Sequence, residues 1–307
     1  MADVVCLGIL VADVIARRVD DLPVRGSLGL VEEISLHGGG CALNTASVLA
    51  RLGLSASVVG KVGADPFGDF VLGLLDERGV ERGGVLRDPE APTSATVVLV
   101  DSGGERTFLH LPGANGCLRL DELDDEALFS GRALHLAGAL VMPEFDGEPA
   151  AAVLERAKER GLTTSLDTVW DATGRWERIL PSLPFVDLFV PSLAEAAAIS
   201  GEQEPEAAAA WLRERGVGTA ALKLGAEGCY VAGEGLEGFI PAPAVEAVDS
   251  TGAGDAFAAG FLYGHLSGWE LERTAAFANA AGALATIAVG AVEGVTRFDD
   301  VLALALG

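Results

Sequence analysis

The residues best suited to chemistry form a glycine-rich turn that runs into an apolar helix. Positions 249–255 are Asp-Ser-Thr-Gly-Ala-Gly-Asp, and the apolar run 256–262 follows directly. Such a turn leaves backbone N–H groups unpaired at the positive end of a helix dipole, which favours an anion such as phosphate. An aspartate in the first helical turn, here Asp255, can also simply stabilise the dipole. Taken alone, the turn leaves both interpretations open.

A second glycine-rich string lies about two hundred residues earlier. Positions 37–46 are His-Gly-Gly-Gly-Cys-Ala-Leu-Asn-Thr-Ala. Gly39 and Gly40 let a ligand approach the backbone closely, and Asn44, one turn into the expected helix, can both donate to and accept from sugar hydroxyls. The alternative is a tight strand-to-helix turn that Asn44 caps locally.

The two strings, in this order, resemble the N-terminal and C-terminal signatures of the ribokinase-like carbohydrate kinases, the PfkB family. In the C-terminal string the resemblance implies that the backbone of Gly252, Ala253 and Gly254 forms an anion hole for the transferring phosphoryl group. It also implies that Asp255 takes the proton of the substrate hydroxyl. Phosphoryl transfer requires mainly positioning, charge stabilisation and one group that deprotonates the nucleophile, so the residue types suit the reaction.

The resemblance implies that Asp13, Gly39, Gly40 and Asn44 bind the substrate. That substrate is expected to be a sugar or sugar acid of the ribose, fructose or 2-keto-3-deoxygluconate type, phosphorylated on a hydroxymethyl group. A nucleoside kinase of the same family and a non-catalytic sugar-binding relative remain alternatives. An NAD-dependent enzyme fits less well, because the 38–40 glycines lack GxGxxG spacing and do not directly follow the first strand.

Residues in the C-terminal half match positions that bind ATP in the family. Lys223, Gly225 and Gly228 lie around a strand end where a cation would complement the charge of the nucleotide phosphates, and Asn279 matches a position near the adenine. The ordinary alternatives are a surface lysine beside a turn and a helix-face asparagine.

The resemblance implies two metal ions, Mg²⁺ and K⁺. The string at 191–195, Pro-Ser-Leu-Ala-Glu, matches an Asn-x-x-Glu site that positions Mg²⁺ and phosphates, with Ser192 in place of the usual asparagine and Glu195 acting on the metal indirectly. Ser-x-x-Glu at a helix start is also a capping box that needs no ligand. Asp249 and Thr251, with the 290–291 segment, are the candidates for a monovalent cation.

The order of the expected elements indicates how these residues are positioned. Short apolar runs alternate with helical patterns, which predicts right-handed crossovers and a doubly wound, mostly parallel α/β sheet with ligands at the strand ends. Strands are expected at 4–10, 57–62, 133–137, 164–167, 185–190, 219–224 and 228–231, and helices at 42–52, 67–78, 148–160, 193–200, 205–215 and, as the last two, from 252 and 270.

Two segments interrupt this rhythm, 13–36 and 93–111. The second has the pattern of a β-hairpin, and the first that of an extended chain. We expect a single ribokinase-like domain over 1–307 with a small β-sheet lid inserted from these segments. By the same resemblance, lids of two subunits are expected to pair in a homodimer.

Composition narrows the partners and the compartment. A net charge of −24 would repel a nucleic-acid backbone, so no nucleic-acid partner is expected. The four cysteines have no metal-finger spacing, which favours a reduced, cytoplasmic chain. No basic n-region opens the sequence and no apolar stretch approaches a membrane span, so neither export nor a membrane partner is expected.

Overall fold

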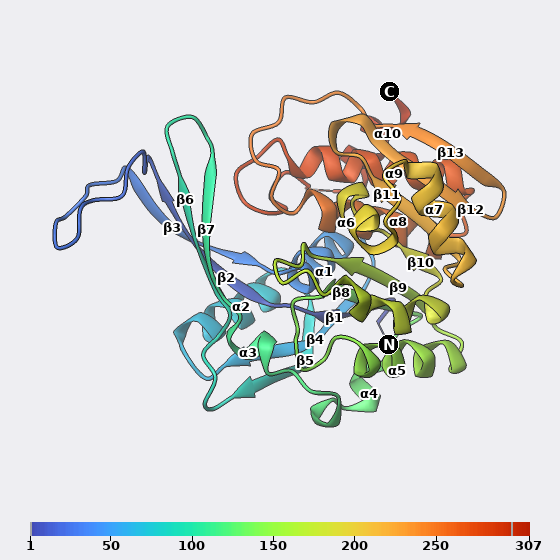
Figure 1. Cartoon of the computed structure of the whole chain (residues 1–307), viewed down its shortest axis with the longest axis horizontal. Helices are drawn as coiled ribbons and strands as arrows, with labels where there is room; N and C mark the ends of the chain where they lie inside the picture. Colours follow the sequence, from blue (N-terminus) through green and yellow to red (C-terminus); the bar gives the residue numbers. More distant parts are fainter. Residues whose placement is uncertain (1, 296) are drawn as a thin grey trace.

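A nine-stranded sheet forms the centre of the molecule (Figure 1). The computed structural model describes residues 2–295 and 297–307. The strand order is β13-β12-β11-β10-β9-β8-β1-β4-β5, and all neighbours pair in parallel except β11 with β12 and β12 with β13. The strands are β1 Val4–Gly8, β4 Ala56–Gly63, β5 Glu81–Asp88, β8 Ala133–Ala139, β9 Thr163–Thr168, β10 Leu188–Phe189, β11 Thr219–Lys223, β12 Gly228–Gly233 and β13 Leu236–Pro241.

Helices cover both faces of this sheet because its central strands are apolar on both sides. In β1, Val4 and Cys6 pack into one hydrophobic cluster, whereas Val5 and Leu7 pack into the other. The first cluster joins α1 Cys41–Leu52, α2 Pro66–Glu77, α8 Ala253–Leu266, α9 Leu271–Ala285 and α10 Phe298–Leu306. The second joins α4 Asp125–Leu128, α5 Glu148–Glu159, α6 Leu193–Ser200, α7 Pro205–Glu214 and the 3₁₀ segment Trp176–Phe185. The predicted doubly wound α/β fold is confirmed.

A separate four-stranded sheet projects from one side of the molecule, at the left of Figure 1. Its order is β3-β2-β6-β7, built from β2 Val11–Arg17, β3 Glu33–Gly39, β6 Ala95–Val100 and β7 Arg106–Leu111. We call this sheet the lid. It comes from the two segments that the sequence pattern had set apart, although β2 and β3 extend beyond the expected 13–36 at both ends.

The strands β5 and β13, the helices α4 and α10 and the 3₁₀ segment Trp176–Phe185 lie where the sequence pattern indicated no element. The two strands are the outermost strands of the large sheet. Three short helical turns, α3 Gly113–Gly116, Leu120–Glu122 and Gly225–Glu227, complete the described elements. None of the described helices has the length and apolar character that crossing a bilayer requires.

Candidate active site

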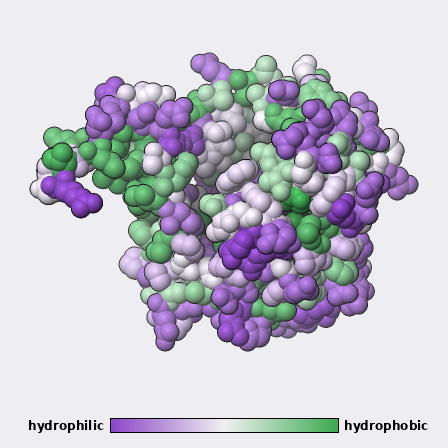
Figure 2. All heavy atoms as spheres, viewed as in Figure 1, coloured by the Kyte–Doolittle hydropathy of each residue, from purple (hydrophilic) through white to green (hydrophobic). Residues whose placement is uncertain are grey.

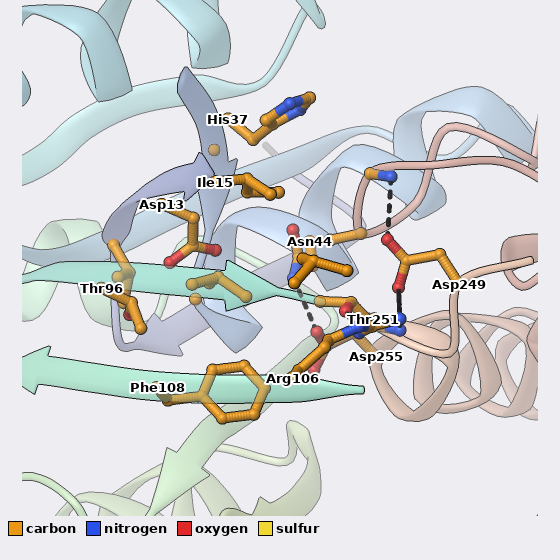
Figure 3. A pocket seen from close by; sticks show the side chains of 18 of the residues that line it. Asp13, Ile15, His37, Asn44, Thr96, Arg106, Phe108, Asp249, Thr251 and Asp255 are labelled. Carbon is orange, nitrogen blue, oxygen red and sulfur yellow. Dashed lines mark hydrogen bonds and ion pairs between the residues drawn. The ribbon is translucent and has the colours of Figure 1, made fainter. Parts of the chain in front are cut away.

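One cavity lies between the lid and the segments that follow β1 and lead into α1 and α8. Its volume is about 310 Å³, and we call it the lid cavity. Side chains of alternate residues in three lid strands face it, as a strand's period of two requires. Figure 3 shows Asp13, Thr96 and Phe108 on the lid side, opposite Asn44 and Asp255. The cavity therefore brings together the substrate candidates of the N-terminal string and the expected base of the C-terminal string.

Asp255 and Asn44 are in direct contact. The Nδ2 of Asn44, in the first turns of α1, donates to Oδ2 of Asp255 at 2.8 Å. Both side chains are buried, and the Oδ1 of Asn44 has no hydrogen-bond partner in the structure. A buried amide oxygen without a donor is unfavourable, so it is a position that a ligand hydroxyl would satisfy.

The environment of Asp255 makes it a stronger base than an ordinary carboxylate. Burial raises its pKa, while hydrogen bonds from Asn44 and from the Cys41 thiol, together with the charge of Lys223, lower it and leave a net rise. A carboxylate with a raised pKa holds an abstracted proton better at neutral pH. Cys41, the residue after Gly40, was not among the predicted site residues.

The turn before α8 depends on Gly252. This residue is the N-cap of α8 with φ of 74°, in the left-handed region that favours glycine. A Cβ at this position would stand 1.8 Å from the carbonyl oxygen of Ala291. Only glycine therefore fits at this position of the turn. The turn in its observed form directs the backbone N–H groups of the first residues of α8 outward.

Asp13 lies on β2 and faces the lid cavity from the side opposite Asp255. Burial raises its pKa, and contact with Thr96 and the charge of His37 partly offset that rise. A Cβ at Gly39 would stand 2.0 Å from Oδ2 of Asp13. Gly39 itself does not line the cavity but leaves room for the Asp13 carboxylate, whereas Gly40 lines it directly.

The lid also contacts the turn before α8. Arg106, on β7, pairs with Oδ1 of Asp249 at 2.6 Å through Nη2 and donates from Nη1 to the hydroxyl of Thr251. The same Oδ1 accepts from the Thr251 N–H, and Oδ2 accepts from the N–H of Gly290. Both Asp249 oxygens and the Thr251 hydroxyl are thus occupied, one by a guanidinium cation. Oδ2 of Asp249 accepts a hydrogen bond from Gly290 alone among these contacts, so the monovalent cation expected here stays a prediction.

A second cavity of about 460 Å³ lies on the other side of the α8 N-terminus, and we call it the C-terminal cavity. Gly225, Gly228 and Lys223 line it, together with Ala253, Gly254 and several small apolar residues of the 242–286 region. Gly252 lines the lid cavity, and Ala253 and Gly254 line the C-terminal one. The two cavities therefore meet at the first turn of α8.

Asn279 lines the C-terminal cavity but already makes structural contacts. Its Nδ2 donates to the carbonyl oxygen of Ile240 at 2.9 Å and to that of Pro241 at 3.3 Å. These bonds tie α9 to the end of β13. Oδ1 of the Asn279 amide then remains for a contact with adenine.

Lys223 is held by a carboxylate that was not among the predicted site residues. Its Nζ lies 2.8 Å and 3.0 Å from the two carboxylate oxygens of Asp167, at the end of β9. Asp167 is the last residue of the strand expected at 164–167, and ligands lie at the ends of such strands, but the sequence gave no partner for it.

Ser192 and Glu195 form the capping box that the sequence allowed. The Ser192 hydroxyl accepts from the N–H of Glu195 at 3.2 Å, and Oε2 of Glu195 accepts from the N–H of Ser192 at 2.8 Å. Neither residue lines the two cavities. The charge of Glu195 nevertheless acts on Asp167, Lys223 and Asp255, so this carboxylate lies close to the junction of the cavities.

The described residues contain no cluster of three or more His, Cys, Asp or Glu side chains that could hold a metal ion. A magnesium ion that arrives with a nucleotide fits this arrangement, because Mg²⁺ is usually held by phosphates, waters and one or two carboxylates. The capping box uses one oxygen of Glu195, which leaves the other for such a contact.

Comparisons with known proteins agree with this geometry. The model of the pfkB family of carbohydrate kinases matches residues 1–296. A fructokinase of Klebsiella pneumoniae is 34% identical, with 85% of this chain and 90% of the relative aligned. An ATP-dependent ribose-1-phosphate kinase of Halopiger xanaduensis is 32% identical over 88% of this chain and 87% of the relative.

A solved structure supports the fold. Arabidopsis thaliana ribokinase, complexed with ribose and ATP, superposes with a TM-score of 0.84 at 24% identity, covering 99% of this chain and 98% of the ribokinase. The match spans the large sheet and the lid, since it leaves almost none of the chain uncovered. The chain belongs to the pfkB family of carbohydrate kinases, and it is an ATP-dependent phosphotransferase that acts on a sugar.

Proposed function

We propose that this kinase transfers the γ-phosphoryl group of ATP to a hydroxymethyl group of a sugar or sugar acid, with Asp255 as the base. The observation that carries the proposal is the position of Asp255, buried at the junction of the two cavities and held by Asn44 at 2.8 Å. Sugar then occupies the lid cavity, and ATP occupies the C-terminal cavity.

In the reaction, the sugar hydroxyl points at Asp255, which takes its proton. The hydroxyl oxygen attacks the γ-phosphorus in line, a new P–O bond forms, and the bond to the bridging oxygen of ADP breaks with its electron pair leaving on ADP. Negative charge on the transferring group is stabilised by the outward amides at Gly252, Ala253 and Gly254 and by the α8 dipole.

The remaining residues position the two substrates. Asp13 and the free Oδ1 of Asn44 accept hydrogen bonds from sugar hydroxyls, and Gly40 allows the ring to approach the backbone. Lys223, Gly225 and Gly228 bind the nucleotide phosphates. Glu195 would help to hold a Mg²⁺ ion that arrives with the nucleotide, and the ion would supply charge neutralisation for the triphosphate. No step passes through a monovalent cation.

The lid suggests a homodimer. Its face opposite the cavity carries an apolar row across all four strands, because Leu36 pairs with Val14, Val14 with Val97, and Val97 with Leu109. Leu109 is 61% exposed, and Figure 2 shows apolar residues gathered on this arm. Burying that row against a second copy removes apolar surface from water. We propose that the chain is one ribokinase-like domain, with the lid as its inserted dimerisation element.

The substrate is identified by a panel assay. ADP release from MgATP is measured with ribose, fructose, 2-keto-3-deoxygluconate, ribose 1-phosphate and a set of nucleosides, and the phosphorylated position is determined by ³¹P and ¹³C NMR. The proposal expects turnover with a sugar or sugar acid and phosphate on its hydroxymethyl carbon. Turnover on a nucleoside alone would support the nucleoside-kinase alternative. Sugar binding without any turnover would indicate a non-catalytic relative.

A further inference from the structure

A buried cluster of charges lies behind the first turn of α8. It contains one cation, Lys223, and three carboxylates, Asp167, Glu195 and Asp255, whose charges all act on the lysine. The reaction proposed above gives roles to Lys223, Glu195 and Asp255. Asp167, which is 2% exposed, has none.

Asp167 and Lys223 make a two-pronged contact. The Nζ of Lys223 lies 2.8 Å from Oδ1 and 3.0 Å from Oδ2 of Asp167. The carboxylate is itself oriented, because its Oδ1 accepts from the N–H of Thr168 at 2.9 Å. The lysine backbone is also fixed, since its N–H donates to the carbonyl oxygen of Pro191 at 2.9 Å.

This contact places the ammonium group beside the expected anion hole. The atom nearest to a Cβ built on Gly254 is Nζ of Lys223, at 3.1 Å. Lys223 and Gly254 line the same cavity, next to Ala253. A lysine ammonium has three N–H donors, and Asp167 engages two of them. The third is available to an oxygen at the first turn of α8.

Without a carboxylate partner, the Lys223 side chain would not keep its ammonium group at that position. Its four-carbon stem has many accessible rotamers, and the ammonium is a point charge without directional geometry of its own. Burial is also costly for the carboxylate: it raises the pKa of Asp167, although the charge of Lys223 opposes the rise. An apolar pair of similar volume would fill the space at lower cost, so the ion pair has a directional use.

We propose that Asp167 is a positioning residue that aims the Lys223 ammonium at the phosphoryl group being transferred. The inference rests on the proposed function, because it assumes that the γ-phosphoryl group of ATP lies at the first turn of α8. It assigns to Asp167 an effect on the triphosphate end of the nucleotide and none on the sugar.

The test compares nucleotide affinities and needs no sugar. Isothermal titration calorimetry measures the Kd of Mg²⁺-AMP-PNP and of Mg²⁺-ADP for the parent protein, Asp167→Asn, Lys223→Met and the double variant. In Asp167→Asn we expect the affinity for AMP-PNP to fall roughly tenfold, as for a lost hydrogen bond to a charged group, and that for ADP to fall less than threefold. In the Lys223→Met background, Asp167→Asn should change neither value, because it acts only through the lysine.

Asp167→Glu is the matched control for charge. It keeps the negative charge but moves the carboxylate by one methylene, so it should also lose affinity for AMP-PNP relative to ADP. If Asp167→Glu binds AMP-PNP with the affinity of the parent protein, Asp167 supplies only a negative charge, and the inference is overturned. So would an equal loss for both nucleotides, or an Asp167→Asn loss that persists without Lys223.

Folding is monitored by thermal melting. Asp167→Asn breaks the ion pair of Lys223, so it should melt below the parent protein, although Glu195 and Asp255 still act on the lysine. If Asp167→Asn does not fold, the Asp167→Glu result decides. A parent protein that phosphorylates a sugar but shows no effect of Asp167 would sink the inference alone. One that neither binds AMP-PNP nor phosphorylates any sugar would overturn the proposed function as well.

Discussion

The two cavities differ in charge and in how the chain builds them. The lid cavity gathers residues from four separate stretches, 9–17, 37–44, 96–110 and 248–291. Its lining includes the carboxylates of Asp13, Asp249 and Asp255 and the guanidinium groups of Arg17 and Arg106, of which Arg106 pairs with Asp249. The C-terminal cavity is lined by residues 223–286 alone, and among the residues that the structure describes there, Lys223 is its one charged side chain.

This difference in lining indicates which substrate each cavity binds. In the lid cavity, the Asp13 and Asp255 carboxylates can accept the O–H groups of a polyol. A cavity with a lysine and a helix N-terminus attracts the triphosphate. The reacting groups can meet only where the two environments join, at the first turn of α8. Each variant below should therefore affect one side, or the junction, selectively.

A large effect is expected from a change in the turn at the junction itself. Gly252→Ala places a Cβ 1.8 Å from the carbonyl oxygen of Ala291, so the turn must shift. The backbone N–H groups of the anion hole then no longer point at the transferring phosphoryl group. We expect kcat to fall by roughly 10²–10³, the range for a lost oxyanion donor. Steady-state kinetics with the sugar identified in the panel assay measures it.

Gly268→Ala is the matched control for this variant. Gly268 has φ of 69°, close to that of Gly252, but a Cβ there has nothing within 4 Å. It should cost about 1 kcal/mol of stability through backbone strain and leave kcat unchanged. Equal kcat losses in the two variants would mean that backbone strain, and not the anion hole, explains the effect.

A smaller effect, confined to the lid cavity, is expected from Asn44→Ala. The change removes the 2.8 Å hydrogen bond to Asp255 and the acceptor for a sugar hydroxyl, so kcat/KM for sugar should fall roughly 10–100-fold. KM for ATP should stay within twofold. Asn279→Ala provides the opposite case, with KM for ATP raised and KM for sugar unchanged. A variant that raises both KM values would contradict the assignment of sugar to the lid cavity and ATP to the C-terminal cavity.

The pH dependence sharpens the role of Asp255. The base works deprotonated, and its folded-state pKa is raised by burial, so kcat/KM for sugar should fall with acidification at a higher pH than an ordinary aspartate allows. The Asn44 N–H lowers that pKa, so Asn44→Ala should move the acid limb to still higher pH. The pH profile of kcat/KM from pH 4.5 to 8 tests this. A limb that moves to lower pH would contradict the assignment.

The smallest effect on chemistry is expected from the outer face of the lid. Leu109→Glu puts a charge at the β7 end of the apolar row, on a residue that is 61% exposed, so the mass measured by size-exclusion chromatography with light scattering should fall from dimer to monomer. Leu306→Glu, at the other end of the chain and 75% exposed, is the control and should not change the mass. A monomeric parent protein would refute the dimer directly.

The sequence predicted the inner part of the large sheet because strands buried on both faces appear as continuous apolar runs. It gave no sign of β5, whose residues Glu81–Asp88 are mostly exposed or half-buried and include charged residues and glycines. The pattern of β13 is similar. Both lie at sheet edges, where one face or side is solvated and the apolar pattern is lost.

The candidate site was predictable wherever its residues are contiguous in the chain, as in the 249–255 and 37–46 strings. Contacts between distant residues were not. Asp167 meets Lys223 across 56 positions, and Arg106 meets Thr251 across 145, and no local pattern encodes either pair. For Ser192 and Glu195 the sequence allowed a capping box or a ligand site, and the structure has the capping box.

The most direct test of the central claim is rapid-quench measurement of phosphoryl transfer by Asp255→Asn beside the parent protein and the surface control Asp299→Asn. We expect a single-turnover rate lower by roughly 10²–10⁴ in Asp255→Asn, with the Kd values for sugar and AMP-PNP within threefold of the parent and Asp299→Asn unchanged. Transfer at the parental rate in Asp255→Asn would show that Asp255 is not the base.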